Sequence, residues 1–230
     1  MDDLTIRAAS LEDIDEICRV EQHWHPQGRA SREKLITRIE KFPQGFFVAT
    51  LPDSGMPRMV ATICAMPLHY DPSRMTAFSS WAAVTNDGYY PDHAGDLPAL
   101  RRRHNALYIV SGIVDPASRG RDLFAPMVGR VVERARSLGL DYVLAGAVLP
   151  GYRRYCEQRG EVSAYAYCRT RRGSSPVDPL LAMYERVGFR IPGPDHVIPE
   201  YFPDDASRNY AAVVVRDLRA DEGVQQAGRY

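Results

Sequence analysis

The chain has 230 residues, of which 45% are apolar, and its 29 basic side chains balance 29 acidic ones. This length and apolar content suffice for one sizeable hydrophobic core, so we expect a single domain with insertions. The balanced charge argues against nucleic acid or a membrane surface as the principal partner. No apolar run approaches the length of a transmembrane helix and the first residues do not read as a signal peptide, so the expected location is the cytoplasm.

The cysteines are not spaced as metal ligands or as a redox pair. In a reducing compartment they are expected to be free thiols, and no metal is expected. A nucleophilic Cys156 has no further support in the sequence. The four positions are Cys18, Cys64, Cys156 and Cys168.

The N-terminal segments predict one strand and two helices. Alternating apolar residues predict a strand over 4–8. Ser10 and Asp13 have the spacing of a capping box and predict the start of a helix, and Ser31 predicts the start of a second helix. The segment that joins the two helices carries two histidines and a tryptophan, namely His23, Trp24 and His25.

Two apolar runs follow, at 45–51 and 58–66, and they predict an antiparallel hairpin. The next segment, 67–105, is too long for an ordinary connection. Its aromatic content favours an ordered insertion with a functional role.

The central stretch is a strand, a sharp turn and a helix. Residues 106–114 are apolar on both faces, as in a strand buried within a sheet. From Leu123 to Leu138 the apolar residues recur at helical spacing, which predicts an amphipathic helix. The turn between them therefore presents the first N–H groups of a helix at the end of a buried strand. Such an arrangement is suited to bind phosphate oxygens.

The remaining sequence predicts two more strands and one more helix. Residues 141–148 predict a strand whose carboxyl end lies near Tyr152, and Asp178 with Pro179 predicts the start of a helix. Residues 210–215 predict a last strand. A polar, arginine-rich insertion is expected at 155–177 and a loosely held polar tail at 217–230.

Two stretches resemble the GNAT superfamily of N-acetyltransferases. Val114-Asp115-Pro116-x-x-Arg119-Gly120-Arg121 resembles its acyl-CoA pyrophosphate loop, and the sequence DPLLAMYERVGF at 178–189 resembles a later helix of the same family. Shorter and weaker motifs resemble the branch of this superfamily that is found joined to carbon-nitrogen hydrolases in bacteria. These motifs lie at 42–49, 88–93, 150–152, 178–181 and 201–207.

The resemblance implies an α/β (α+β) fold of the GNAT type, in which a central mixed, mostly antiparallel sheet with splayed fourth and fifth strands is flanked by helices. It implies one acyltransferase domain over 1–216, with insertions at about 67–105 and 155–177. The implied reaction is direct transfer of an acyl group to an amine of a small molecule, and the acyl group expected is acetyl. The co-substrate would be acetyl-CoA or another acyl-CoA, and an acyl carrier protein is a further candidate partner.

The resemblance also assigns roles to residues. Tyr184 stands at the position of the family's tyrosine, which protonates the departing thiolate, and backbone N–H groups near Ile113 and Val114 would stabilise the oxyanion. The base stays open among His93, His25, Tyr152 and Glu200, and a bound water would leave no trace in the sequence. The residues expected to bind the donor are Ile113, Val114, Arg119, Gly120, Arg121, Asp122 and Leu123.

The loop departs from the family pattern, since Asp122 and Phe124 stand where the family has small residues. We expect Asp122 to cap the helix and to compete with the diphosphate, with Arg119 and Arg121 offsetting the repulsion. The protein could bind CoA in a shifted pose, take its acyl group from another carrier, or keep the fold as a non-catalytic binding module. Hydrolysis or decarboxylation of a thioester is a further alternative.

Overall fold

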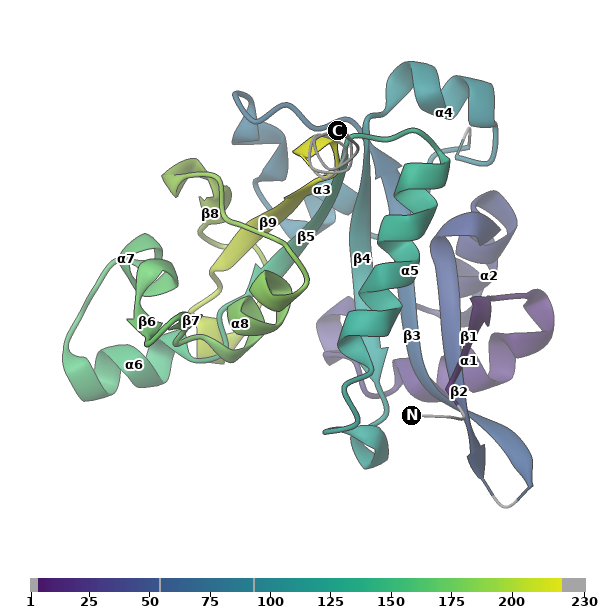
Figure 1. The fold of residues 1–230 in the computed structure, drawn as a ribbon, viewed down its shortest axis with the longest axis horizontal. Helices are drawn as coiled ribbons and strands as arrows, with labels where there is room; N and C mark the ends of the chain where they lie inside the picture. Colours follow the sequence, from purple (N-terminus) through teal and green to yellow (C-terminus); the bar gives the residue numbers. More distant parts are fainter. Residues whose placement is uncertain (1–3, 54, 93, 221–230) are drawn as a thin grey trace, which may run out of the picture. The chain divides into compact units, whose positions relative to one another are not determined.

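The computed structural model describes residues 4–53, 55–92 and 94–220 (Figure 1). Within these ranges the chain forms two compact units. The first contains 4–69 and 88–143, and the second contains 70–87 and 144–220. The insertion expected at 67–105 is therefore divided between the two units.

The first unit is built on four antiparallel strands that pair in chain order, so the predicted hairpin and central strand are confirmed. The central strand is the most buried, because Ala106, Leu107 and Tyr108 have no exposed surface. The strands are β1 (Thr5–Ala8), β2 (Phe46–Asp53), β3 (Met56–Leu68) and β4 (Ala106–Val114).

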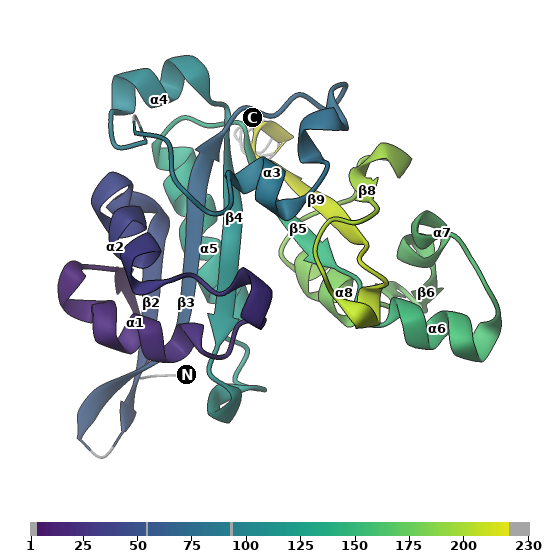
Figure 2. The same cartoon turned by 180° about the vertical axis from the view of Figure 1, so that it is seen from behind.

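Helices cover both faces of these strands. Figure 1 shows α5 (Phe124–Ser137) over one face, and Figure 2 shows α1 (Ile14–Glu21) and α2 (Arg32–Lys41) over the other. The predicted apolar stripe of α5 is confirmed, because Met127 and Val131 are buried. A short helix, α4 (Leu97–Arg103), precedes β4.

The predicted helix starts are confirmed in detail. The carboxylate of Asp13 accepts the backbone N–H of Ser10 at 2.8 Å, which completes the capping box. One 3-10 turn, η1 (Leu11–Asp13), precedes α1. The hydroxyl of Ser31 accepts the N–H of Lys34 at the start of α2.

The strand β5 (Tyr142–Val148) begins in the first unit and continues in the second. At its start the N–H groups of Asp141 and Tyr142 donate to the carbonyl of Asn105, at 2.8 and 3.1 Å. Because Asn105 directly precedes β4, the two strands start side by side, as in a parallel pair.

In the second unit the strand order is β5, β9, β8, and Arg190 forms a further bridge to Val215. The strands are β8 (Val197–Ile198) and β9 (Ala211–Asp217), with a separate hairpin of β6 (Arg171–Arg172) and β7 (Ser175–Pro176). The helices are α3 (Trp81–Thr85), α6 (Tyr152–Arg159), α7 (Ala164–Arg169) and α8 (Pro179–Arg186).

The stretch 155–177, expected as a polar and arginine-rich insertion, contains most of α6, all of α7 and the hairpin of β6 and β7. The rings of buried Tyr152 and Tyr167 pack between α6 and α7 at an angle of 38°. The polar tail does not begin at 217, since β9 ends there and Leu218 is only 3% exposed. The rest of the expected tail, 221–230, lies outside the described residues. In the described part of the chain, no helix has the length and apolarity needed to span a membrane.

Candidate functional site

The strand β4 carries a bulge four residues before its end. Cys64 of β3 pairs with Ser111 and Ala65 pairs with Ile109, so Val110 is the extra residue of β4 relative to β3. A bulge bends its strand and changes the direction of the backbone groups that follow. The groups that follow here are those of Ile113 and Val114, the predicted oxyanion donors.

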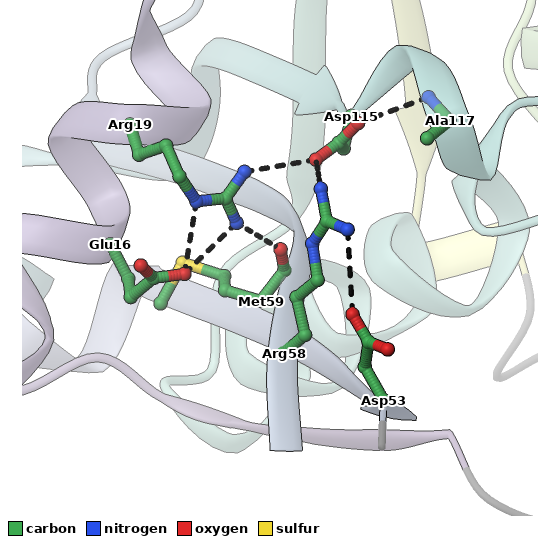
Figure 3. Close-up of polar contacts among 7 residues, drawn as sticks. All are labelled: Glu16, Arg19, Asp53, Arg58, Met59, Asp115 and Ala117. Carbon is green, nitrogen blue, oxygen red and sulfur yellow. Dashed lines mark hydrogen bonds and ion pairs between the residues drawn. The ribbon is translucent and has the colours of Figure 1, made fainter. Parts of the chain in front are cut away.

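The turn after β4 is fixed by the buried carboxylate of Asp115 (Figure 3). It accepts the N–H of Ala117 at 3.0 Å and the guanidiniums of Arg19 and Arg58 at 2.9 and 3.1 Å. Burial alone would raise the pKa of Asp115, but the Ala117 N–H and the two guanidiniums hold that pKa below its usual value. The side chain is therefore ionised at neutral pH and anchors the start of the predicted donor loop.

The loop itself has left-handed backbone at two positions, Gly120 with φ of 86° and Asp122 with φ of 50°. Glycine adopts this conformation freely, whereas aspartate does so at some cost. The conformation at 122 thus agrees with the family's preference for a small residue there.

The N-cap residue of α5 is Leu123, and the side chain of Leu123 makes no capping hydrogen bond. Asp122 lies one position earlier and has left-handed backbone. That its carboxylate caps the helix stays a prediction. Close by, Arg119 and Arg121 are exposed, and within the described ranges neither guanidinium has a hydrogen-bond or ion-pair partner.

The predicted acid Tyr184 lies on α8 in the second unit and is 8% exposed. Its ring packs edge-on against Phe189, with centroids 5.2 Å apart. The position of α8 depends on Asp178, whose carboxylate accepts the N–H groups of Leu180 and Leu181, which confirms the predicted cap.

The other oxygen of Asp178 accepts the N–H of Gly151 at 3.2 Å and the hydroxyl of Tyr167 at 2.9 Å. Burial raises the pKa of Asp178, and the four donors oppose that shift. One fully buried carboxylate therefore joins the start of α6, α7 and the start of α8.

Tyr152 begins α6 in the same unit, and its ring packs on Tyr167, which contacts Asp178. Its hydroxyl donates to the carbonyl of Val162 at 2.7 Å, and burial raises the pKa of Tyr152 to about 12. Because its pKa lies far above 7, this hydroxyl stays protonated near neutral pH and accepts a proton poorly. Tyr152 and Tyr184 thus share the second unit, whereas the predicted donor loop belongs to the first.

The other candidate bases have ordinary structural surroundings. His25 caps the turn η2 (Pro26–Gly28), where its Nδ1 accepts the N–H of Gln27. Exposed Glu200 accepts the side-chain amide of Asn209 at 2.9 Å. His93 lies outside the described residues, and the thiol of Cys156 is buried.

One buried pair of polar residues, a tyrosine and a histidine, could not be predicted from the sequence. The hydroxyl of Tyr70 lies 2.8 Å from Nε2 of His196, which is 3% exposed, and Nδ1 of His196 has no partner among the described residues. Burial lowers the pKa of His196, so the ring is neutral at pH 7 and able to accept a proton. The two residues are 126 positions apart, so no local spacing could have revealed the pair.

A second buried polar cluster lies in the first unit. Arg38 of α2 is 1% exposed and donates to the carbonyl of Gly88 and toward the thiol of Cys64, which lies 3.1 Å from the hydroxyl of Ser111. Among the described residues, Nη2 of Arg38 and the hydroxyl of Tyr90 have no partner.

The second unit also contains a cavity of about 370 Å³ that the sequence did not predict. Five of its twelve lining residues come from the insertion expected at 155–177. Its lining combines aromatic and apolar side chains with arginines. The residues are Tyr165, Cys168, Arg169, Arg171, Pro176, Leu181, Tyr184, Glu185, Phe189, Arg190, Ile191 and Val214.

Comparison with known proteins confirms the fold class. No protein-family model matches the chain. Two solved N-acetyltransferases, the ribosomal-protein-S18-alanine enzyme from Escherichia coli and an agmatine enzyme, are 13% and 17% identical and similar over 94% of this chain and 94% and 100% of their own, with TM-scores of 0.53 and 0.54. A structure described as a putative acetyltransferase, YncA from Salmonella typhimurium with its cofactor acetyl-CoA, is 14% identical over 94% and 95% of the two chains, with a TM-score of 0.53. The chain therefore has the GNAT fold, a mixed and mostly antiparallel sheet flanked by helices.

More specific similarity is to GNAT-like domains. The GphF GNAT-like decarboxylase in complex with isobutyryl-CoA is 26% identical, with a TM-score of 0.71, and the match covers 94% of this chain and 100% of that one. The loading GNATL domain of CurA from Lyngbya majuscula is 17% identical, with a TM-score of 0.69 over 94% and 98% of the two chains.

One curated relative bears on the resemblance to the GNAT branch that is joined to hydrolases. The probable hydrolase YhcX of Bacillus subtilis (strain 168) is 25% identical over 228 residues, which is 99% of this chain and 41% of YhcX. The chain thus spans about two-fifths of the length of that protein. The similarity agrees with the resemblance to GNAT domains joined to hydrolases.

Proposed function

We propose that the protein is an acyltransferase that moves an acyl group from a CoA-type thioester to the amine of a small molecule. The observation that carries this proposal is the loop after the bulged β4. There α5 begins after Leu123, whose side chain makes no capping hydrogen bond, and exposed Arg119 and Arg121 flank a left-handed glycine. N–H groups at a helix N-terminus and arginine forks are the groups that bind diphosphates in proteins.

The residues present fit a CoA diphosphate only in part. The first two residues of α5, Phe124 and Ala125, carry N–H groups, but the third, Pro126, has none. Asp122 adds a negative charge beside the same helix end. Arg119 and Arg121 would then supply much of the attraction, which predicts a salt-dependent affinity for the donor.

The proposed reaction is a direct displacement. The nitrogen of the amine bonds to the thioester carbonyl carbon while N–H groups near Ile113 and Val114 stabilise the oxyanion. The C–S bond then breaks and Tyr184 donates a proton to the sulfur. The base stays open among His93, His25, Tyr152 and Glu200.

Calorimetric titration with acetyl-CoA and with a pantetheine-loaded carrier protein tests the first substrate. Turnover with a panel of amines, followed by mass spectrometry, tests the second. Tyr184→Phe should lower kcat by about 10²–10⁴-fold, the usual contribution of a general acid. The proposal would be contradicted if both donors gave no heat, or if Tyr184→Phe kept full activity.

Decarboxylation of a carboxyacyl thioester is a second candidate. It is favoured by the similarity to the GphF GNAT-like decarboxylase, whose TM-score of 0.71 exceeds the 0.53 and 0.54 of the two N-acetyltransferases. In this reaction a C–C bond breaks, carbon dioxide leaves, and the carbanion takes up a proton. Conversion of malonyl-CoA to acetyl-CoA without any amine would favour this candidate over amine transfer.

A further inference from the structure

The cavity of the second unit is lined by apolar side chains, which we call its floor, and by arginines, which we call its rim. Leu181, Phe189, Ile191 and Val214 supply apolar surface, and Cys168 adds no negative charge because burial raises the pKa of its thiol to about 12. A volume of about 370 Å³ is within the range of pockets that bind small molecules.

The arginines of the rim differ in their partners. Arg171 forms two hydrogen bonds with the carboxylate of Glu185, at 2.7 and 3.1 Å, so its charge is neutralised locally. Arg190 donates to the carbonyls of Glu185 and Phe189, which orient its guanidinium without neutralising it.

Arg169 is exposed, and its guanidinium lies 5.8 Å from the centroid of the Tyr165 ring. Within the described ranges it has no hydrogen-bond or ion-pair partner. The rim therefore offers two guanidiniums, those of Arg169 and Arg190, that no carboxylate pairs.

We propose that this cavity binds the acceptor and selects an amine that carries a carboxylate on an apolar body, as an apolar α-amino acid does. A planar guanidinium pairs with a carboxylate through two parallel hydrogen bonds, and the floor would take the apolar side chain. This inference rests on the proposed function, because Tyr184, the proposed acid, lines the same cavity.

The basic rim would also help to activate the amine. Nearby positive charges disfavour the ammonium form and so lower the pKa of the bound amino group. The neutral nitrogen then bonds to the acyl carbon and passes its proton to the base, and the thiolate leaves with a proton from Tyr184. The products are an N-acyl amino acid and the free thiol.

The test compares L-phenylalanine with 2-phenylethylamine, which differ only by the carboxylate. With acetyl-CoA as donor, KM should be at least tenfold lower for phenylalanine. Arg169→Gln should raise the KM for phenylalanine at least tenfold, and it should raise the KM for phenylethylamine by a much smaller factor. Arg172→Gln is the matched control, because Arg172 is exposed in the same segment and does not line the cavity.

Calorimetry without donor separates failure of this inference from failure of the proposed function. Binding of phenylalanine that Arg169→Gln weakens, with no transfer to any amine, would overturn the transferase function and support carboxylate recognition. Transfer to both amines with equal KM would support the transferase and overturn carboxylate recognition. An equal loss in Arg172→Gln would overturn it as well.

Discussion

Substitution of Asp115 by Asn tests how the turn that leads into the predicted donor loop is held. An asparagine keeps one oxygen to accept the N–H of Ala117. Its amide nitrogen replaces the oxygen that accepts hydrogen bonds from Arg19 and Arg58. The amide and the two guanidiniums would then all be donors, with no acceptor between them. Both guanidinium bonds are therefore lost while the shape of the side chain is kept.

The magnitude follows from the exposure of the partners. A hydrogen bond to a charged group contributes about 1.5–3 kcal/mol. The side chains of Arg19 and Arg58 are 34% and 45% exposed, so water would compensate part of each lost bond. We expect a total loss of roughly 2 kcal/mol, and a fall in Tm of about 4–8 °C for a chain of this length.

The loss should also depend on pH. The pKa of Asp115 is lower in the folded protein than its ordinary value, so its pairing stabilises the fold above that ordinary value. The ordinary aspartate pKa is about 3.9. The difference between wild type and Asp115→Asn should therefore be fully present at pH 7 and shrink as the pH falls below about 4.

Urea denaturation at pH 7 and at several acidic pH values measures this difference. Glu16→Gln is the matched control, because Glu16 also pairs with Arg19 but its side chain is 51% exposed. Loss of such a surface pair costs about 0–1 kcal/mol. Equal effects of the two substitutions, or an Asp115→Asn difference that does not change with pH, would refute the reasoning.

Three further substitutions test other parts of the structure. Asp122→Gly should tighten binding of acetyl-CoA in calorimetry by about two- to fivefold, the size of a charge effect at a helix N-terminus, and weaker binding would show that the carboxylate assists. Tyr90→Phe should raise the free energy of unfolding by about 1 kcal/mol, because it removes a buried hydroxyl that has no partner among the described residues; a loss would reveal an ordered water. Gly146→Ala should cost about 1–3 kcal/mol, because the new methyl group would overlap the ring and hydroxyl of Tyr201, and an unchanged Tm would contradict that packing.

The sequence predicts well the elements whose causes are local. The strand expected at 106–114 is Ala106–Val114, because a run that is apolar on both faces leaves few alternatives to a central strand. The cap at Asp178 is confirmed because it needs only N–H groups two and three residues away. Patterns of this kind encode structure within a few neighbouring residues.

The parts of the site that depend on distant contacts could not be predicted. Tyr70 and His196 meet across 126 positions, and the cavity draws its wall from four separate segments. The left-handed backbone at Asp122 could not be predicted for a different reason. Residue type alone does not determine φ, and the N-cap position of α5 falls at Leu123.

The contacts of Asp178 have a consequence for attempts to redesign acceptor preference. Loop grafts between α6 and α8 would replace the segment that contains Tyr167, whose hydroxyl shares one carboxylate with the N-cap of α6 and the first turn of α8. A graft that altered the spacing from Tyr167 to Asp178 would therefore disturb the helix that carries Tyr184. Libraries that vary only the tip of the hairpin at Gly173 and Ser174 would leave that junction intact.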